Sequence, residues 1–188
     1  MSKKRVVITG MGMTSPVGSE LDVAWSNILA GKSGIVKIKD FDVSAFPTKI
    51  AGLVKDFKVN NYLSKKDQRK NDPFVHYGVA ATIDAVLDSG LEITETNGHR
   101  VGIAMGSGIG GIKSIEENHK KMLEGGVRKI SPFFIPGSII NMVSGKVSIL
   151  QQITGPNLSI VTACASSTHC IGLSARTIEH GDADVMLA

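Results

Sequence analysis

The chain has 188 residues, of which 42% are hydrophobic and 20% are charged, with 21 glycines and 6 prolines. This composition is typical of a globular protein and excludes a disordered chain, a collagen-like repeat and a disulfide-rich scaffold. No apolar run approaches the roughly 20 residues that span a bilayer, so we expect no membrane insertion. The N-terminal apolar run Val6–Ile8 is too short for a signal peptide, which predicts a cytoplasmic location.

The net charge of +4 is unevenly distributed along the chain. Residues 1–70 contain 13 Lys and Arg against 6 Asp and Glu, whereas residues 71–188 contain 8 against 11. In the segment Ser64–Lys70, helical spacing places Lys66, Arg69 and Lys70 on one face, and Arg128–Lys129 forms a second short cluster. Either cluster is explained by a solvated face, and an acidic partner is the alternative. Nucleic acid is not favoured, because no aromatic residues alternate with the charges.

The first third of the chain predicts one strand and one helix. Arg5–Thr9 is a β-branched run before a glycine turn, typical of a buried strand. A helix is expected from Ser19 to a C-terminal Gly31. Its apolar face comprises Leu21, Trp25, Ile28 and Leu29. Residues 32–62 predict loops and weak strands.

A second helix is expected from Asp72-Pro73 to Ser89-Gly90. Its apolar stripe comprises Val75, Val79, Ala80, Ile83, Val86 and Leu87. The pattern then predicts a strand at 100–105, a polar helix at 113–123, a buried helix at 136–149, a core strand at 157–161, a helix through 179 and a final strand at 184–188.

This alternation of strands and helices predicts an α/β fold with a mixed central sheet flanked by helices, in one domain over residues 1–188. Because a domain rarely ends inside an uncapped strand, we expect the chain to be part of a longer protein.

The glycines at 106, 108 and 111 match a dinucleotide-binding fingerprint between a strand and a helix. That fingerprint needs a second strand about 20 residues later that ends in an acidic residue. The chain instead continues into the polar stretch 124–129, so close backbone packing explains these glycines better. We expect no nucleotide or other cofactor.

Cys164 lies where the apolar run Ser159–Val161 gives way to a helix of small residues. The free N–H groups at a helix start stabilise a thiolate and a developing oxyanion, so Cys164 is the candidate nucleophile. Cys170 points away from it and is expected to pack in the interior. His169 lies about 140° around the helix from Cys164, so we expect it to be structural. The remaining histidines show no metal-ligand spacing, and no metal site is predicted.

Several segments together resemble the β-ketoacyl-[acyl-carrier-protein] synthases of fatty acid synthesis. The matching segments are RVVITGMGMTSPVG (5–18), AGLVKDF (51–57), SKKDQRK (64–70), DSGLEIT (88–94), GSGIGG (106–111), EENH (116–119), RKISPFF (128–134), VTACASS (161–167) and GDADVM (181–186). The family has the thiolase fold, in which two βαβαβαββ halves join their sheets, usually in a homodimer. The resemblance therefore implies that this chain is an N-terminal half. Two positions, Ser167 and Cys170, depart from the family pattern.

The resemblance implies a decarboxylative Claisen condensation. An acyl thioester loads Cys164, and malonyl-carrier protein then loses CO₂ and extends the chain. Ile109 and Phe134 match positions that line the acyl tunnel. The cations that match the surface for acyl carrier protein are Lys65, Lys66, Arg69, Lys70, Arg128 and Lys129. The two histidines for the malonyl group belong to the missing half, so we expect the isolated chain to be incomplete.

Two alternatives remain open at the level of sequence. A non-catalytic half-domain would bind carrier protein or pair with a complementary chain. A papain-like thiol hydrolase would need a histidine with an Asn or Asp to orient it, and the sequence marks none.

Overall fold

The computed structural model describes residues 4–188. Its central sheet has three strands in the order β4-β3-β5, with β3 (Val101–Gly106) between β4 (Asn157–Ile160) and β5 (Val185–Leu187). Both pairings are parallel, with Ile103 opposite Asn157 on one side and Leu187 on the other. Arg100, just before β3, forms an ion pair of 2.9 Å with Asp184, just before β5.

The two faces of β3 carry side chains of different size. The face with large side chains packs against α3 and α6, and the face with small side chains packs against α7. Val101 and Ile103 join a buried cluster with α3 (Pro73–Ser89) and α6 (Met142–Gln151). Successive strand residues face opposite sides, so Gly102, Ala104 and Gly106 point to the other face. There α7 (Ser166–His180) approaches closely, because a Cβ on Gly106 would lie only 3.2 Å from Ser166 Cβ.

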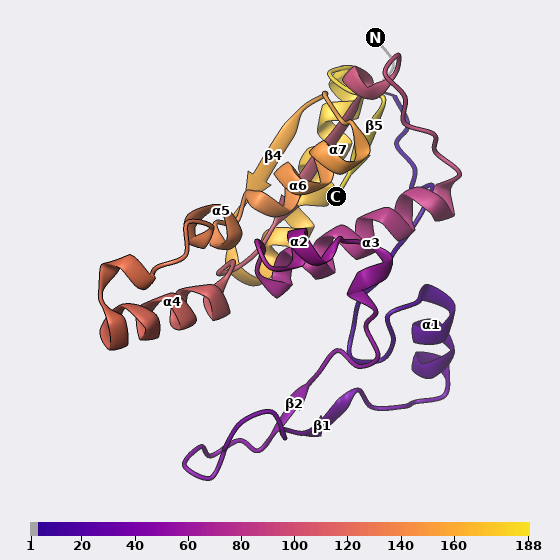
Figure 1. Ribbon diagram of the computed structural model, residues 1–188. Coiled ribbons are helices and arrows are strands. Elements are labelled where there is room, and N and C mark those ends of the chain that lie inside the picture. The colour runs from indigo at the N-terminus through magenta and orange to yellow at the C-terminus, as the bar shows by residue number, and fades with distance from the viewer. Residues whose placement is uncertain (1–3) are drawn as a thin grey trace.

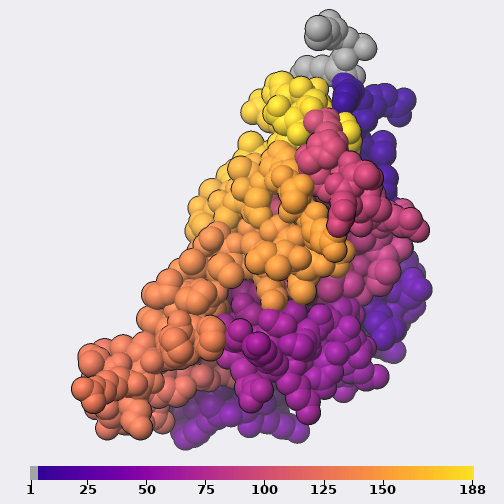
Figure 2. All heavy atoms as spheres, turned by 45° about the horizontal axis from the view of Figure 1, so that its top comes forward, coloured from indigo at the N-terminus to yellow at the C-terminus, as the bar shows by residue number. Residues whose placement is uncertain are grey.

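Two further parts extend from this body (Figure 1). One contains α1 (Leu21–Leu29) and an antiparallel ribbon of β1 (Ile35–Lys37) and β2 (Ile50–Gly52). The other, which we call the arm, comprises residues 112–133 with α4 (Ile112–Gly125) and the 3-10 turn Val127–Lys129. Figure 2 shows the arm projecting from the body. The short helices α2 (Lys65–Gln68) and α5 (Phe134–Ser138) lie where the arm meets the body.

Several predicted elements are confirmed. The second predicted helix is α3, which begins after the cap Asp72 and ends at Gly90 with φ of 66°. The strand at 100–105, the polar helix at 113–123, the helix ending near 179 and the final strand correspond to β3, α4, α7 and β5. The α/β class is also as predicted.

The sheet itself differs from the expected mixed sheet, because its described strands are all parallel and antiparallel pairing is confined to β1 and β2. The predicted strand Arg5–Thr9 is wrong, since these residues join no strand and Ile8 is 79% exposed. A β-branched run forms a strand only beside a free, aligned partner. Here Gly10 and Gly12 instead pack against the backbone of α3.

The predicted buried helix at 136–149 is two helices, because Ile139 has extended backbone between α5 and α6. The predicted core strand at 157–161 is the edge strand β4, and Leu158 is 39% exposed. The apolar face of α1 is largely exposed, since Ala24 is its buried residue. Leu87 also lies outside the core, since it is 73% exposed near the end of α3.

Candidate functional site

Cys164 lies in a sharp turn between β4 and α7, within the 3-10 turn Ala163–Ala165, and its residue is exposed. Ala163 has φ of 50°, a left-handed conformation that costs a non-glycine residue about 1 kcal/mol or more. Ser166 braces the turn from its buried position. Its Oγ accepts a hydrogen bond from Thr162 N at 3.0 Å and donates one to the carbonyl oxygen of Ala163 at 2.8 Å.

This turn presents Cys164 at the start of the fifteen-residue helix α7. The first N–H groups of a helix have no partner within it, and its N-terminal end carries a partial positive charge. A thiolate, or an oxyanion formed on a substrate carbonyl, is stabilised at such a place. The geometry therefore fits a nucleophile that is raised from the sheet edge and open to a substrate.

The glycine-rich loop after β3 lies directly beside this turn. A Cβ on Gly106 would overlap the carbonyl oxygen of Ile160, and one on Gly108 would lie 3.7 Å from Ala163 Cα. Gly111 N donates to the carbonyl oxygen of Ser138 at 2.8 Å, which ties the loop to α5. The loop carries Ile109, which is 65% exposed, and α5 begins at the half-buried Phe134. The loop that carries Ile109 thus contacts both the turn of Cys164 and α5, where Phe134 lies, and the role of both residues in binding an acyl chain stays a prediction.

The two other residues of α7 that the sequence singled out have structural contacts. His169 Nδ1 shares a hydrogen bond of 2.7 Å with Thr162 Oγ1. Cys170 is 1% exposed, and burial raises the pKa of its thiol. Within residues 4–188, no group of three His, Cys, Asp or Glu side chains is placed to hold a metal ion.

The predicted docking cations fall in two places. Lys65, Lys66 and Arg69 are exposed around α2, and the half-buried Lys70 lies with its Nζ 4.8 Å from the ring centre of Phe133. Arg128 and Lys129 are exposed on the arm, away from α2 (Figure 1). We call the first set, Lys65, Lys66, Arg69 and Lys70, the α2 cations.

A groove of about 300 Å³ lies between the α2 cations and the arm. Arg69 and Lys70 line one side, and Lys113 and Lys121 of α4 line the other, where Glu117 lies between them and pairs with Lys113 at 4.0 Å. Sequence reasoning missed these two lysines, although their i, i+8 spacing on a helix places them on one face. Burial lowers the pKa of His76, which also lines the groove.

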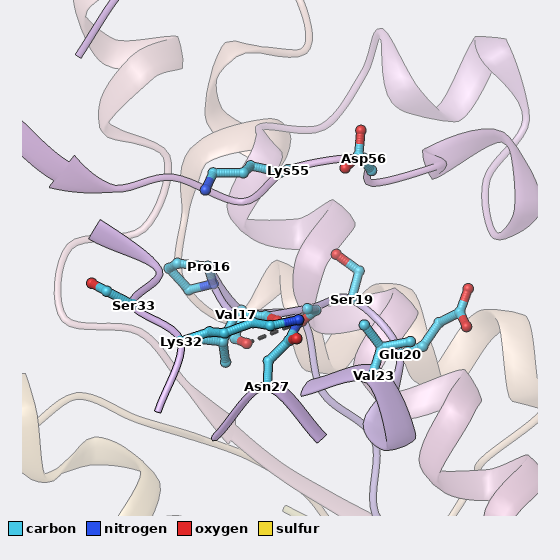
Figure 3. A pocket seen from close by; sticks show the side chains of 12 residues that line it. Pro16, Val17, Ser19, Glu20, Val23, Asn27, Lys32, Ser33, Lys55 and Asp56 are labelled. Atoms are coloured by element: carbon cyan, nitrogen blue, oxygen red, sulfur yellow. Dashed lines mark hydrogen bonds between the residues drawn. The ribbon is translucent and has the colours of Figure 1, made fainter. Parts of the chain in front are cut away.

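A second groove, of about 380 Å³, lies near α1 (Figure 3). Asn27 stands in it and donates to the carbonyl oxygen of Val17 at 2.7 Å. Its charged lining is mixed, with Lys32 and Lys55 against Glu20 and Asp56. No residue of the turn around Cys164 lines it, so it is separate from the candidate site.

The chain is similar to known proteins over its whole length. Among curated proteins, 3-oxoacyl-[acyl-carrier-protein] synthase 2 of Vibrio harveyi is 56% identical over all 188 residues, and that of Coxiella burnetii is 55% identical. The chain covers 45% of each of these two relatives. It therefore spans about half the length of the curated relatives it matches.

Solved ketosynthase structures have the same fold. The ishigamide ketosynthase/chain length factor superposes with a TM-score of 0.89 at 25% identity, covering 98% of this chain and 46% of that one. A type II PKS ketosynthase in complex with its acyl-carrier protein superposes with a TM-score of 0.82 at 27% identity, covering 98% of this chain and 50% of that one.

No helix in the described part of the chain is long and apolar enough to cross a membrane. The family model described as "Beta-ketoacyl synthase, N-terminal domain" matches residues 3–188. Together with the thiolase-like fold shared with the ketosynthases, this match shows that the chain belongs to the β-ketoacyl synthase family and corresponds to its N-terminal domain.

Proposed function

We propose that this chain is the acyl-accepting part of a 3-oxoacyl-[acyl-carrier-protein] synthase that extends fatty acyl chains. The observation that carries the proposal is the position of Cys164, exposed on a strained turn at the start of α7. The family and the names of the curated relatives support the same activity.

In the first half-reaction, the Cys164 thiolate attacks the carbonyl carbon of an acyl thioester. A carbon–sulfur bond to Cys164 forms, the bond to the carrier sulfur breaks, and the proton lost by Cys164 ends on the departing thiol. The Cys164 N–H contributes to stabilising the oxyanion at the helix start. The acyl chain then lies toward the loop of Ile109 and toward Phe134.

In the second half-reaction, malonyl-carrier protein loses CO₂ and its carbanion attacks the acyl carbon on Cys164. This step releases the cysteine thiolate and lengthens the chain by two carbons. We expect the two histidines for this step in the part of the relatives that this chain does not cover, as the resemblance to the family implies. We therefore expect residues 1–188 alone to accept an acyl group without completing condensation.

The test combines intact mass and product formation. In the full-length protein, Cys164→Ala is expected to abolish the acyl-enzyme adduct after incubation with acyl-carrier protein, because the nucleophilic sulfur is gone. Cys170→Ala is the matched control. It should keep the adduct, since Cys170 is 1% exposed and a thioester cannot reach its thiol. An adduct that persists in Cys164→Ala contradicts the assignment of Cys164 as the nucleophile. Formation of β-ketoacyl product by residues 1–188 alone contradicts the expectation that this part cannot complete condensation.

The proposed partner is acyl carrier protein, which docks on the α2 cations together with Arg128 and Lys129. A ketosynthase of similar fold has been solved in complex with its acyl-carrier protein, which supports this partner. The excess of basic over acidic residues in 1–70 suits an acidic protein.

We also propose that the complete protein is a homodimer and acts in the cytoplasm. The edge strand β4 supports the dimer. Leu158 on this strand, Val161 just after it and Ile171 on α7 are apolar and exposed. An uncovered strand edge with apolar neighbours favours pairing with another chain. Sedimentation of the full-length protein as a monomer at micromolar concentration would contradict the dimer. The two free cysteines are compatible with a reducing compartment.

A further inference from the structure

Helix α2 is too small to hold its own orientation by packing. It has four residues, Lys65–Gln68, and none of them is buried. Helices this short gain little from backbone hydrogen bonds and depend on tertiary contacts. Nevertheless α2 and the turn after it carry the four α2 cations, and their direction decides what surface a partner meets.

Asp67, the one acidic residue in 64–70, pairs with a lysine outside the α2 cations. Its Oδ1 accepts a hydrogen bond from Lys146 Nζ of α6 at 2.6 Å, and its Oδ2 accepts one from Ser64 Oγ at 2.6 Å. The side chains of Lys146 and Asp67 are 15% and 29% exposed. The Lys146 ammonium, followed by the Ser64 hydroxyl, holds the pKa of the Asp67 carboxyl below its ordinary value.

The other side-chain contacts of this segment are with nearby residues, apart from Lys70, whose Nζ lies 4.8 Å from the ring centre of Phe133 on the arm. Gln68 Nε2 donates to Asn60 Oδ1 and to the carbonyl oxygen of Leu63, and Asn71 Nδ2 donates to the carbonyl oxygen of Asp67. His76 Nε2 lies 3.2 Å from the carbonyl oxygen of Gln68.

The ion pair instead joins residues that are 79 positions apart. Lys146 stands on a firm support, since its neighbours Val143 and Val147 on α6 are 4% and 0% exposed. Among the described contacts of α2, this pair is therefore the side-chain link to α6, beside the contact of Gln68 with His76 of α3.

We propose that the Asp67–Lys146 pair is a positioning device for carrier-protein docking, which fixes α2 to α6 and so presents Lys65, Lys66, Arg69 and Lys70 in one orientation. This inference rests on the proposed function, because it assumes that these cations meet the acidic carrier. Neither member of the pair needs to touch the carrier or the acyl group. Without the pair, the four cations keep their charge, but α2 is no longer fixed in one orientation relative to α6.

Two single substitutions in the full-length protein separate positioning from bulk electrostatics, because they change the net charge in opposite directions. Lys146→Met removes a positive charge, and Asp67→Ala removes a negative one. If only net charge mattered, an acidic carrier would bind Lys146→Met more weakly and Asp67→Ala more tightly. If the pair positions α2, both substitutions weaken binding.

The expected result is that both variants raise KM for octanoyl-[acyl-carrier protein] by roughly fivefold, in the range of coupling through a positioning contact. The kcat, and the rate of Cys164 acylation by octanoyl-coenzyme A, should change less than about twofold, because coenzyme A carries no protein to dock. Lys146→Arg keeps the charge pair and should restore KM. A general folding defect would instead lower acylation by both thioesters.

The matched controls are Lys37→Met and Asp22→Ala, which make the same charge changes at exposed positions on β1 and α1. They should leave KM unchanged. Tighter carrier binding by Asp67→Ala, or an unchanged KM in both pair variants, overturns the positioning role. If the wild-type protein itself shows no preference for the carrier-borne thioester, the proposed function fails instead, so the two failures are distinct.

Discussion

At the scale of single residues, Asp72 does more than begin the helix that the sequence predicted. Its Oδ1 accepts a hydrogen bond from Phe74 N at the start of α3, at 3.3 Å. Its Oδ2 accepts one from Ser114 N in the first turn of α4, at 2.8 Å, and the residue is 5% exposed. One buried carboxylate thus caps two helices and joins the arm to the body. The cap of α3 was evident from Asp72-Pro73, whereas the cap of α4 comes from a residue 42 positions away.

We expect Asp72→Ala to lower the free energy of unfolding by about 2 kcal/mol, since each lost N-cap costs about 1 kcal/mol. Asp72→Asn should lose much less, because the amide oxygen still accepts a hydrogen bond. Urea unfolding of the full-length protein, followed by circular dichroism, measures the difference. Equal losses in the two variants would show that capping is not the cause.

The charged form of Asp84 destabilises the folded protein, so the free energy of unfolding depends on pH through this residue. Burial raises the pKa of its carboxyl, and the nearby Glu20 charge adds a smaller increase. A hydrogen bond of 2.9 Å from Tyr62 Oη acts in the opposite direction without cancelling the effect of burial. Burial, then the contact with Asp84, also raises the pKa of Tyr62 to about 12. A carboxyl whose pKa is higher in the folded state favours folding when it is protonated, and this benefit is lost as pH rises through the folded pKa.

Asp84→Asn is therefore expected to raise the melting temperature at pH 7, because the amide keeps an acceptor for Tyr62 and has no charge to desolvate. The gain should disappear at a pH below the ordinary value of 3.8, where the wild-type carboxyl is protonated in both states. Calorimetry at pH 3 and pH 7 measures it. A gain of the same size at both values would contradict an electrostatic origin.

At the scale of elements, the turn that holds Cys164 depends on how closely β3, β4 and α7 approach one another. Small side chains on one face of β3 permit this approach, and Ser166 of α7 hydrogen bonds across the turn that holds Cys164. The residue pattern in 159–167 predicted a strand followed by a helix. It did not indicate that Ala163 adopts a positive φ, because alanine carries no preference for that region.

Gly106→Ala is expected to cost about 1–3 kcal/mol of stability, because the added methyl group overlaps the carbonyl oxygen of Ile160 and overpacks the core. It should also slow Cys164 acylation, since the strand and helix that hold the turn must separate. Gly145→Ala is the matched control within α6, where an added Cβ meets no atom within 4 Å. That substitution should stabilise the protein by up to about 1 kcal/mol. Thermal unfolding and the acylation rate, measured side by side, test both.

At the scale of the whole molecule, the body and the arm enclose a groove with cations on both walls. The sequence showed the excess of charge in residues 1–70 and two basic clusters. The fold adds Lys113 and Lys121 to the wall opposite Arg69 and Lys70. An acidic partner that docks on the α2 cations would meet these lysines too.

Lys121→Glu is therefore expected to weaken carrier binding by about fivefold at low salt, with a smaller effect at high salt because exposed charges are screened. The control is Lys120→Glu, which makes the same change one residue earlier, outside the groove lining. It should have a clearly smaller effect. Fluorescence anisotropy with labelled acyl carrier protein at two ionic strengths compares them, and equal losses would exclude a specific role for the groove.

The sequence by itself determined the fold class, the limits of α3, the approximate extent of α4, the end of α7 and the place of the candidate nucleophile between a strand and a helix. These features follow from local signals, namely Asp72-Pro73 and Gly90 at the ends of α3, helical periodicity, and a cysteine between a strand and a helix. Tertiary structure decided the rest. Whether Arg5–Thr9 enters a sheet, and whether Leu158 lies in the core or at an edge, depends on which neighbours are present. The double cap by Asp72 and the pair of Asp67 with Lys146 join residues far apart in the chain, and local periodicity carries no information about such distant contacts.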